Sequence, residues 1–299
     1  MEIRTLKYFL AIAQEESFSK AGDNVLFVTQ PTLSRQMQEL EEELGVKLFY
    51  RKGKRTLLTE EGLRFRKRAE EILELVDKTE SELKSAADEE IAGDIYIGAG
   101  ETDGMRLIIR AICDVQIRYP KIRFHLFSGN AQDVMEKLDR GLLDFGLLID
   151  PIDRAKYDFL NLPDRDIWGI LMRKDHPLAQ KSRVCAKDIL HLPLITSAQL
   201  ERTNWFSGWL GKSLDSLNII ASYNLIFNAA LMVDEGLGCA LTLDKLTYTG
   251  ENSHLCFKPL SPKCESGLVF VWKKNPVFSR QAKVFLEALQ EILSEEFQR

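Results

Sequence analysis

Six polar side chains lie within an eight-residue stretch near the start of the chain, "TQPTLSRQ" at residues 29–36. Their types suit hydrogen bonding to nucleic acid, because an amide side chain can pair with adenine and a guanidinium group with guanine. Hydroxyl groups and helix N-termini can bond phosphate oxygens. We expect this stretch to face DNA through Thr29, Gln30, Pro31, Thr32, Ser34, Arg35 and Gln36.

A helix must hold these side chains on one face. Thr29 is a favourable N-cap, Pro31 fits a first helical turn and Gly45 is a stop signal, which together predict a helix over residues 30–44. We expect its apolar face to pack on a small core and to leave the polar face exposed. The apolar residues recur at helical spacing, at Leu33, Met37, Leu40 and Leu44.

Two further helices are predicted before this one. The second is short and starts near Ser19, and only "FVT" separates it from the helix at 30–44, which is the spacing of a helix-turn-helix. In that motif the second helix enters the major groove by its N-terminal end, and we include Ser19 among the DNA-facing residues. An ordinary helical hairpin is the alternative. The first helix carries an apolar face formed by Leu6, Phe9, Leu10 and Ala13.

A basic hairpin is predicted next. Two β-prone segments, "KLFY" and "RTLLT", flank "RKGK", whose glycine permits a tight turn. Directly after a helix-turn-helix, this hairpin indicates a wing. We expect it to bind the phosphates or the minor groove of DNA through Arg51, Lys52, Lys54 and Arg55.

The net charge of −5 hides a gradient along the chain. Residues 1–70 hold 13 Lys and Arg against 11 Asp and Glu, whereas residues 71–299 hold 27 against 34. Nine of the basic residues lie between Lys47 and Arg68. This asymmetry indicates a basic face beside an acidic domain, although solvated helix surfaces give a similar composition.

Glu60 and Glu61 open a long predicted helix, with acidic residues at its positive end. Apolar and small residues then alternate at spacings of four and three, the heptad pattern of paired helices. We expect this helix to dimerise the chain, since two helix-turn-helix modules related by a dyad contact two half-sites. Packing of the helix on its own domain is the alternative. The seam consists of Phe65, Ala69, Ile72, Val76, Thr79, Leu83 and Ala86.

The segment "FSKAGDNVLFVTQPTLSRQMQELEEELGVKLFYRKGKRTLLTEEG" resembles the LysR-type transcriptional regulators, and the resemblance extends over essentially the whole chain. It implies a winged helix-turn-helix at residues 1–59 and a dimerising linker helix at 60–88. The remainder, residues 91–299, is then an effector domain similar to periplasmic binding proteins.

The pattern beyond residue 91 agrees with an α/β domain. Strand-like and helical segments alternate from "DIYIGAG" to "DFGLLID", which predicts a mostly parallel sheet with covering helices. A second round of alternation begins near "DIWGILMRKDHPLA". The resemblance implies two lobes, with residues 91–162 and 266–299 in lobe I and residues 163–265 in lobe II. Two crossings between them would leave a hinged cleft.

The cleft is the expected site for a small effector, because ligands of α/β domains bind at the carboxyl ends of strands and at helix N-termini. The family often has Ser and Thr without acids in the first loop, whereas this chain has "GETDG". We therefore expect Glu101 and Asp103 to favour a cationic or hydroxyl-bearing effector. Loop residues that match the family's effector contacts, each also an ordinary cap or turn residue, are Gly100, Glu101, Thr102, Ser128, Asn130, Thr196, Ser197 and Asn224.

Other classes of protein fit the sequence less well. "IYIGAGETDG" is one residue off the dinucleotide fingerprint, and "GWLGKS" has Phe206 where a phosphate loop needs its first glycine. The four histidines and five cysteines show no metal-ligand spacing, so we expect no enzyme, no cofactor and no metal. The basic hairpin and the lack of a signal-peptide pattern disfavour a solute-binding protein.

The sequence therefore predicts a cytoplasmic DNA-binding regulator without a membrane segment. Its expected partners are a double-stranded DNA operator, a small-molecule effector and further copies of the chain in a homodimer or homotetramer. The resemblance adds RNA polymerase to these partners.

Overall fold

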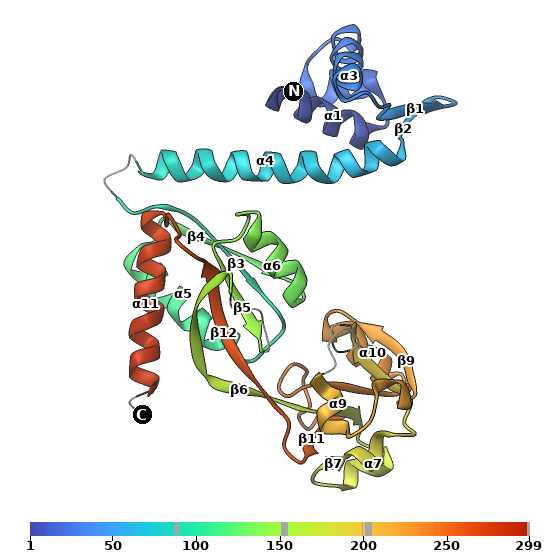
Figure 1. Cartoon of the computed structure of the whole chain (residues 1–299), viewed down its shortest axis with the longest axis vertical. Helices are drawn as coiled ribbons and strands as arrows, with labels where there is room; N and C mark the ends of the chain where they lie inside the picture. Colours follow the sequence, from blue (N-terminus) through green and yellow to red (C-terminus); the bar gives the residue numbers. More distant parts are fainter. Residues whose placement is uncertain (87–89, 151–154, 199, 201–204, 298–299) are drawn as a thin grey trace. The chain divides into compact units, whose positions relative to one another are not determined.

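The computed structural model describes residues 1–86, 90–150, 155–198, 200 and 205–297. It divides the chain into two compact units, Met1–Lys84 and Ser85–Arg299, whose elements are labelled in Figure 1. Each unit has a hydrophobic core of its own. Among the described residues, no helix is both long and apolar enough to cross a membrane.

The first unit consists of helices and one two-stranded hairpin around a small core. Leu33, Met37 and Leu40 are almost fully buried there, as their helical spacing predicts. They pack with Leu6 and Phe9 of the first helix. The elements are α1 (Ile3–Glu15), α2 (Phe18–Lys20), the π-helical turn η1 (Ala21–Leu26), α3 (Gln30–Leu44), β1 (Phe49–Lys52), β2 (Arg55–Leu58) and α4 (Glu60–Ala86).

Helix α3 has the predicted bounds, but its start differs in one detail. Pro31 lies in the first turn and Gly45 ends the helix with a φ of 70°. Thr29 is the N-cap residue, but its side chain accepts no hydrogen bond from the helix backbone. Its hydroxyl lies 2.9 Å from the hydroxyl of Thr32 instead. Upstream, a Cβ at Gly22 would lie 2.3 Å from the carbonyl oxygen of Val28, so only glycine fits this turn before α3.

The beginning of α4 belongs to the core of the first unit. The ring of Phe65 lies 4.8 Å from that of Phe9 in an edge-to-face contact, and Ala69 is completely buried. The expectation that Ala69 faces a partner helix is therefore wrong for this structure, because its own domain already covers it. Thr79 and Leu83, further along, are exposed. The side chain of Ala86 and the predicted linker residues 87 and 88 lie outside the described part of the chain.

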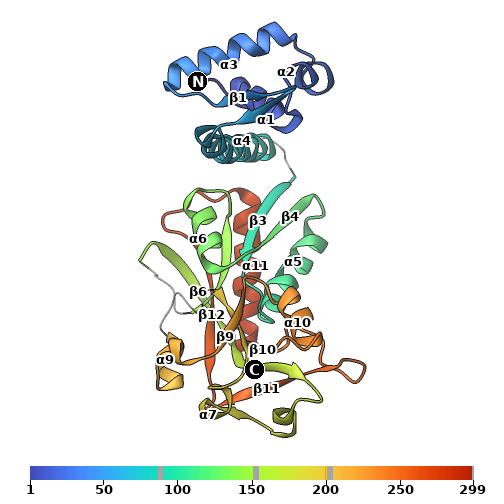
Figure 2. The same cartoon turned by 90° about the vertical axis from the view of Figure 1, so that its right-hand side faces the viewer.

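Lobe I of the second unit is a sheet with helices on both faces (Figure 2). Strand β3 runs parallel to β4 and β5, as the alternating pattern predicts. Along β12, Leu268, Phe270 and Trp272 pack toward α5 and α11, whereas Val269 and Val271 pack toward α6. The elements are β3 (Gly93–Ala99), α5 (Met105–Arg118), β4 (Ile122–Ser128), α6 (Ala131–Asp139), β5 (Phe145–Ile149), β12 (Glu265–Lys273) and α11 (Arg280–Phe297).

Lobe II repeats this arrangement with its own two apolar clusters. Its strand β8 is parallel to β9 and β10. The elements are η2 (Pro177–Gln180), β7 (Val184–Cys185), α7 (Ala186–Ile189), β8 (Leu194–Ser197), α9 (Trp205–Leu210), η3 (Leu214–Ser216), β9 (Ile219–Tyr223), α10 (Ile226–Asp234), β10 (Cys239–Leu243) and β11 (Leu255–Ser261).

One long strand, β6 (Tyr157–Arg173), takes part in both lobes. Its first half pairs with β12, and its second half pairs with β10 and β11, in each case antiparallel. The crossing strands thus join the two lobes into a single ten-stranded sheet, and the sheet is less uniformly parallel than the sequence predicts. The chain returns to lobe I along β12, so two strands connect the lobes (Figure 1).

Candidate DNA interface and effector cleft

The polar side chains at the start of α3 form hydrogen bonds with side chains one turn further along the helix. Gln30 donates from Nε2 to Ser34 Oγ at 2.7 Å, and Arg35 donates from Nε to Glu39 Oε1 at 2.8 Å. Hydrogen bonding and charge from Glu39 raise the pKa of the Arg35 guanidinium, which therefore stays protonated. Because a guanidinium carries five N–H donors, Arg35 can hold Glu39 through Nε and still present its two terminal nitrogens to a base.

The exposed face of α3 is narrower than the sequence predicts. Thr29, Pro31, Thr32 and Arg35 are exposed, and Ser19 is exposed in the preceding α2. Ser34 is half-buried in a hollow that it shares with residues of the core and of the hairpin. Gln30 and Gln36 are also half-buried, and Gln36 donates to Glu39 at 2.9 Å. The most outward side chains for a DNA groove are therefore those of Thr29, Pro31, Thr32 and Arg35.

The basic hairpin has the predicted turn. Gly53 has a φ of 63°, a conformation that glycine adopts without strain, and Lys52 faces Arg55 across the hairpin. Lys52 and Lys54 are exposed at the tip, and Arg51 is exposed on β1. Arg55 instead donates to Glu16 at 3.2 Å, which ties the wing to the end of α1.

Glu41 is a buried residue of α3 whose role the sequence did not reveal. Its Oε1 accepts hydrogen bonds from the backbone N–H groups of Leu48 at 2.8 Å and Phe49 at 3.1 Å. Its Oε2 accepts from Lys47 at 2.6 Å, and this contact raises the pKa of the lysine. One carboxylate of α3 thus fixes the position at which the hairpin begins. Its position on the buried side of the helix, four residues after Met37, is the signal that could have identified it.

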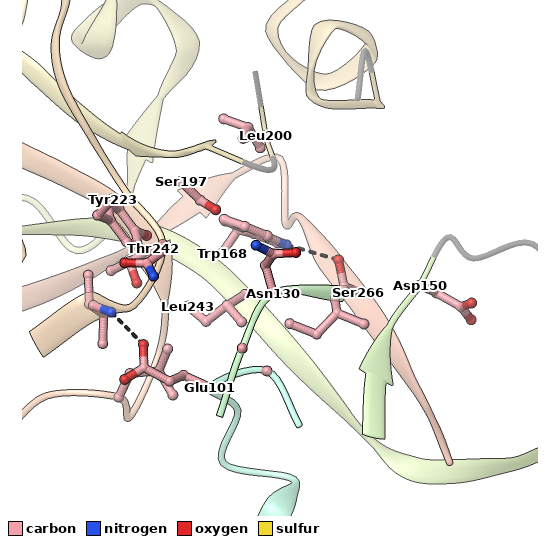
Figure 3. A pocket seen from close by; sticks show the side chains of 16 residues that line it. Glu101, Asn130, Asp150, Trp168, Ser197, Leu200, Tyr223, Thr242, Leu243 and Ser266 are labelled. Atoms are coloured by element: carbon pink, nitrogen blue, oxygen red, sulfur yellow. Dashed lines mark hydrogen bonds between the residues drawn. The ribbon is translucent and has the colours of Figure 1, made fainter. Parts of the chain in front are cut away.

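A cleft lies between the two lobes of the second unit (Figure 3). The space between its side chains, including the part open to solvent, is about 720 Å³. No lysine or arginine lines it among the described residues, whereas Glu101 and Asp150 do. The lining residues are Gly100, Glu101, Gly129, Asn130, Ile149, Asp150, Trp168, Ser197, Leu200, Tyr223, Asn224, Ile226, Thr242, Leu243, Leu246 and Ser266.

One part of this lining is aromatic and aliphatic. The Trp168 indole donates to Ser266 Oγ at 2.9 Å, and the Tyr223 hydroxyl donates to the carbonyl of Leu241 at 2.9 Å. Burial raises the pKa of Tyr223 to about 12, so this hydroxyl stays neutral. Because both polar tips are already bonded, these rings offer the cleft mainly their apolar surfaces.

The sequence missed this part of the lining, since single aromatic residues within apolar strands look like ordinary core residues. Tyr223 could have been found from its position directly before Asn224, at the end of a strand.

Five of the eight predicted effector residues line the cleft. Gly100, Glu101, Asn130, Ser197 and Asn224 do so, although Asn130 also caps α6 by accepting from two backbone N–H groups.

The remaining three predicted residues lie elsewhere. Thr196 is completely buried in the sheet. Ser128 lies on a neighbouring open groove. Thr102 is buried, where its hydroxyl accepts from the N–H of Gly104 at 3.1 Å. These three do not reach the cleft in this structure, because the strand and loop backbones direct them to other sides.

The two acids of the "GETDG" loop have different surroundings. Glu101 points into the cleft and accepts a hydrogen bond from the backbone N–H of Ile226, the first residue of α10 (Figure 3). Asp103 instead accepts from Arg106 at 2.7 Å and from Lys245 at 3.2 Å. Partial burial opposes ionisation of Asp103, but the bonds from Arg106 and Lys245 hold its pKa below the ordinary value. Of these two acids, only Glu101 therefore contributes charge directly to the cleft.

Asp166 lies on β6 at the crossing between the lobes and is 6% exposed. Burial is the main cause that raises its pKa to about 6, and a hydrogen bond with Thr102 opposes this rise. Its Oδ2 has no hydrogen-bond partner within the described part of the chain. A buried carboxyl of this kind is costly to ionise.

A winged helix-turn-helix followed by a two-lobed α/β domain with a cleft defines a class of ligand-responsive DNA-binding regulators. The chain belongs to the LysR family: residues 3–63 match the model "Bacterial regulatory helix-turn-helix protein, lysR family", and residues 88–294 match the "LysR substrate binding domain". It is therefore a DNA-binding transcriptional regulator with an effector-binding domain.

Full-length relatives share this organisation. The chain is 29% identical to the transcriptional regulator YvbU of Bacillus subtilis, over 99% of this chain and all of that protein. It is 27% identical to the Hca operon transcriptional activator HcaR of Escherichia coli, over 98% of this chain and 99% of that protein.

Solved structures agree with the fold. CbnR, a LysR family regulator, matches 98% of this chain and 99% of its own with a TM-score of 0.74 at 18% identity. HinK of Pseudomonas aeruginosa matches 98% of each chain with a TM-score of 0.56 at 26% identity.

Proposed function

We propose that the outward face of α3 and the tip of the wing bind a specific operator, and that the chain does so as a homodimer or homotetramer in the cytoplasm. The exposed Lys52 and Lys54 support phosphate contacts, and the exposed Thr32 and Arg35 support contacts with bases. CbnR, whose fold this chain shares, has been crystallised with its target DNA, which supports DNA as the partner of this chain. RNA polymerase is the further partner that we propose at promoters.

Self-association is assigned to the C-terminal half of α4. Phe65 and Ala69 are occupied in the core of their own unit, so the proposed seam is shorter than the sequence predicts. Thr79 and Leu83 are exposed on α4 and remain for a partner helix.

The cleft between the lobes is proposed to bind a small effector that is cationic or uncharged and hydroxyl-bearing. The observation that carries this proposal is the Glu101 carboxylate in the lining, which holds no lysine or arginine among the described residues. A bound anion would be repelled by the negative charge of Glu101. The ring of Trp168 adds an apolar surface on which an organic cation can lie.

Calorimetry with amines, sugars and carboxylates tests this assignment. We expect an amine or a polyol to bind, and expect Ser197→Ala or Asn224→Ala to weaken its binding at least about tenfold through lost hydrogen bonds. Ser222→Ala is the matched control, because Ser222 is exposed on β9 and does not line the cleft. Tight binding of a dicarboxylate that depends on Ser197 would overturn the charge argument.

Footprinting of genomic DNA bound by the full chain tests the operator assignment. We expect protected sites with a two-fold repeat, because two related modules contact two half-sites. Uniform protection irrespective of sequence would contradict it.

A further inference from the structure

A carboxylate of lobe I caps a helix of lobe II. Glu101 follows β3, and its Oε2 accepts the hydrogen bond of the Ile226 N–H at the start of α10. The N-cap residue of α10 is Leu225, whose side chain has no oxygen to accept a hydrogen bond from the first turn. The nearby Asn224 bonds only the N–H of Leu225, at 3.0 Å, among the contacts described for its side chain. Glu101 therefore takes the place that a Ser, Thr or Asp normally has in the same helix.

The contact is electrostatically favourable as well as geometrically specific. The N-terminus of α10 carries a partial positive charge, and a carboxylate there is stabilised. No basic side chain lines the cleft among the described residues, so this helix end is the principal positive group that Glu101 meets there. A hydrogen bond to a charged acceptor is stronger than one between neutral groups.

A second contact from the same loop also joins the lobes. Asp103 Oδ2 lies 3.2 Å from Lys245 Nζ, and Lys245 follows β10 in lobe II. The lysine side chain is 66% exposed, so solvent weakens this ion pair. Two residues of one short loop thus bind lobe II, and the partly buried contact of Glu101 is the stronger one.

We propose that Glu101 is a latch that holds the two lobes together while the cleft is empty, and that an effector acts by drawing this carboxylate away from Ile226. This proposal rests on the proposed function, because it describes the step by which an effector bound in the cleft changes the conformation of the effector domain. An ammonium or hydroxyl group can take over the carboxylate as its own partner and so free the N-terminus of α10. The lobes then turn about the two connecting strands, β6 and β12.

The latch can be tested in the full chain without DNA or effector. The native Cys113 is exposed on α5 of lobe I and can carry one spin label. A second label is placed on lobe II through Leu237→Cys, since Leu237 is exposed. Cys185 and Cys256 are replaced by serine to prevent further labelling, and unlabelled protein is added in excess so that only distances within one chain are measured. Hydrogen exchange at the start of α10 is measured in parallel.

Three variants separate the latch from general effects of charge. Glu101→Gln removes the charge and Glu101→Asp keeps it on a side chain that is one methylene shorter. Asp164→Asn, which removes an exposed carboxylate from β6, is the control. We expect both Glu101 variants to broaden the distribution of distances between the lobes and to speed exchange of the Ile226 amide at least about tenfold, as loss of a charged hydrogen bond implies. The control should match the wild-type protein in both measurements.

The outcomes are distinguishable from those of the proposed function. Unchanged distances in Glu101→Gln would overturn the latch, whatever the calorimetric screen finds. The latch would also be overturned if Glu101→Asp behaves as the wild-type protein while Glu101→Gln broadens the distribution of distances between the lobes. In that case the charge in the cleft, and not the hydrogen bond to Ile226, would hold the lobes together. If the latch is confirmed but no compound in the calorimetric screen binds, only the proposed sensing role is removed.

Discussion

The buried carboxyl of Asp166 makes the stability of the second unit depend on pH in a defined direction. Its pKa in the folded protein is about 6, against an ordinary value of 3.8. The folded state therefore holds this proton more tightly than the unfolded state between these two values. Stability that the protonated form contributes is present below pH 3.8 and is lost as the pH rises toward about 6.

The magnitude follows from the two pKa values. The difference between about 6 and 3.8 corresponds to about 3 kcal/mol, at about 1.36 kcal/mol for each pKa unit. Asp166→Asn removes the ionisation and keeps an oxygen that can accept the hydrogen bond from Thr102. We expect the variant to gain up to about 3 kcal/mol in free energy of unfolding relative to the wild-type protein between pH 4 and pH 7.

Denaturant unfolding followed by tryptophan fluorescence measures this difference. All four tryptophans, at positions 168, 205, 209 and 272, lie in the second unit, so their fluorescence reports on that unit alone. Subtracting wild-type from variant values at each pH cancels the titration of the other carboxyl groups. Glu251→Gln, at an exposed position of lobe II that is not among the causes of the Asp166 shift, should give a flat difference. A flat difference for Asp166→Asn as well would refute the argument, because burial would then impose no cost on the ionised form.

Three further variants test the proposed contacts with DNA and with a second chain. Changing Lys52 and Lys54 to alanine should lower the slope of log K against log salt by about one unit for each lost phosphate contact, and an unchanged slope would show that the tip does not touch DNA. Arg35→Ala should cost about 1–3 kcal/mol on the operator in a titration followed by fluorescence anisotropy, while an equal loss on random DNA would exclude a base contact. Leu83→Glu should weaken self-association in sedimentation, since it places like charges across the seam, and a variant as dimeric as the wild-type protein would exclude this part of α4.

The local features of the DNA-binding unit could be predicted from the sequence. The bounds of α3 follow from Pro31 and Gly45, and the burial of Leu33 and Met37 follows from their spacing. The tight turn of the wing follows from Gly53. Each of these features depends on residues within one or two turns, where backbone preferences and the side-chain period act directly.

The partners of individual side chains were decided by the tertiary structure. The sequence places Glu101 in a loop of lobe I, but only the packing of the lobes brings it to Ile226, 125 residues later. Ala69 fits a heptad seam by its spacing, yet the core of its own unit covers it. Thr196 is a polar residue at the end of a strand, and the sheet buries it completely.

The physical reason is that periodicity specifies which face of an element is apolar, but it does not specify what covers that face. Burial and charge pairing depend on segments that are distant in the chain. Asp166 shows this most directly, since "DRDIWG" contains three charged residues in a row, as in a solvent-facing turn. The last of them is enclosed where β6 crosses between the lobes, and this enclosure is the main cause that raises its pKa to about 6. The sequence thus determined the elements and their faces, whereas the contacts between the lobes determined which acids are buried and which helix end Glu101 caps.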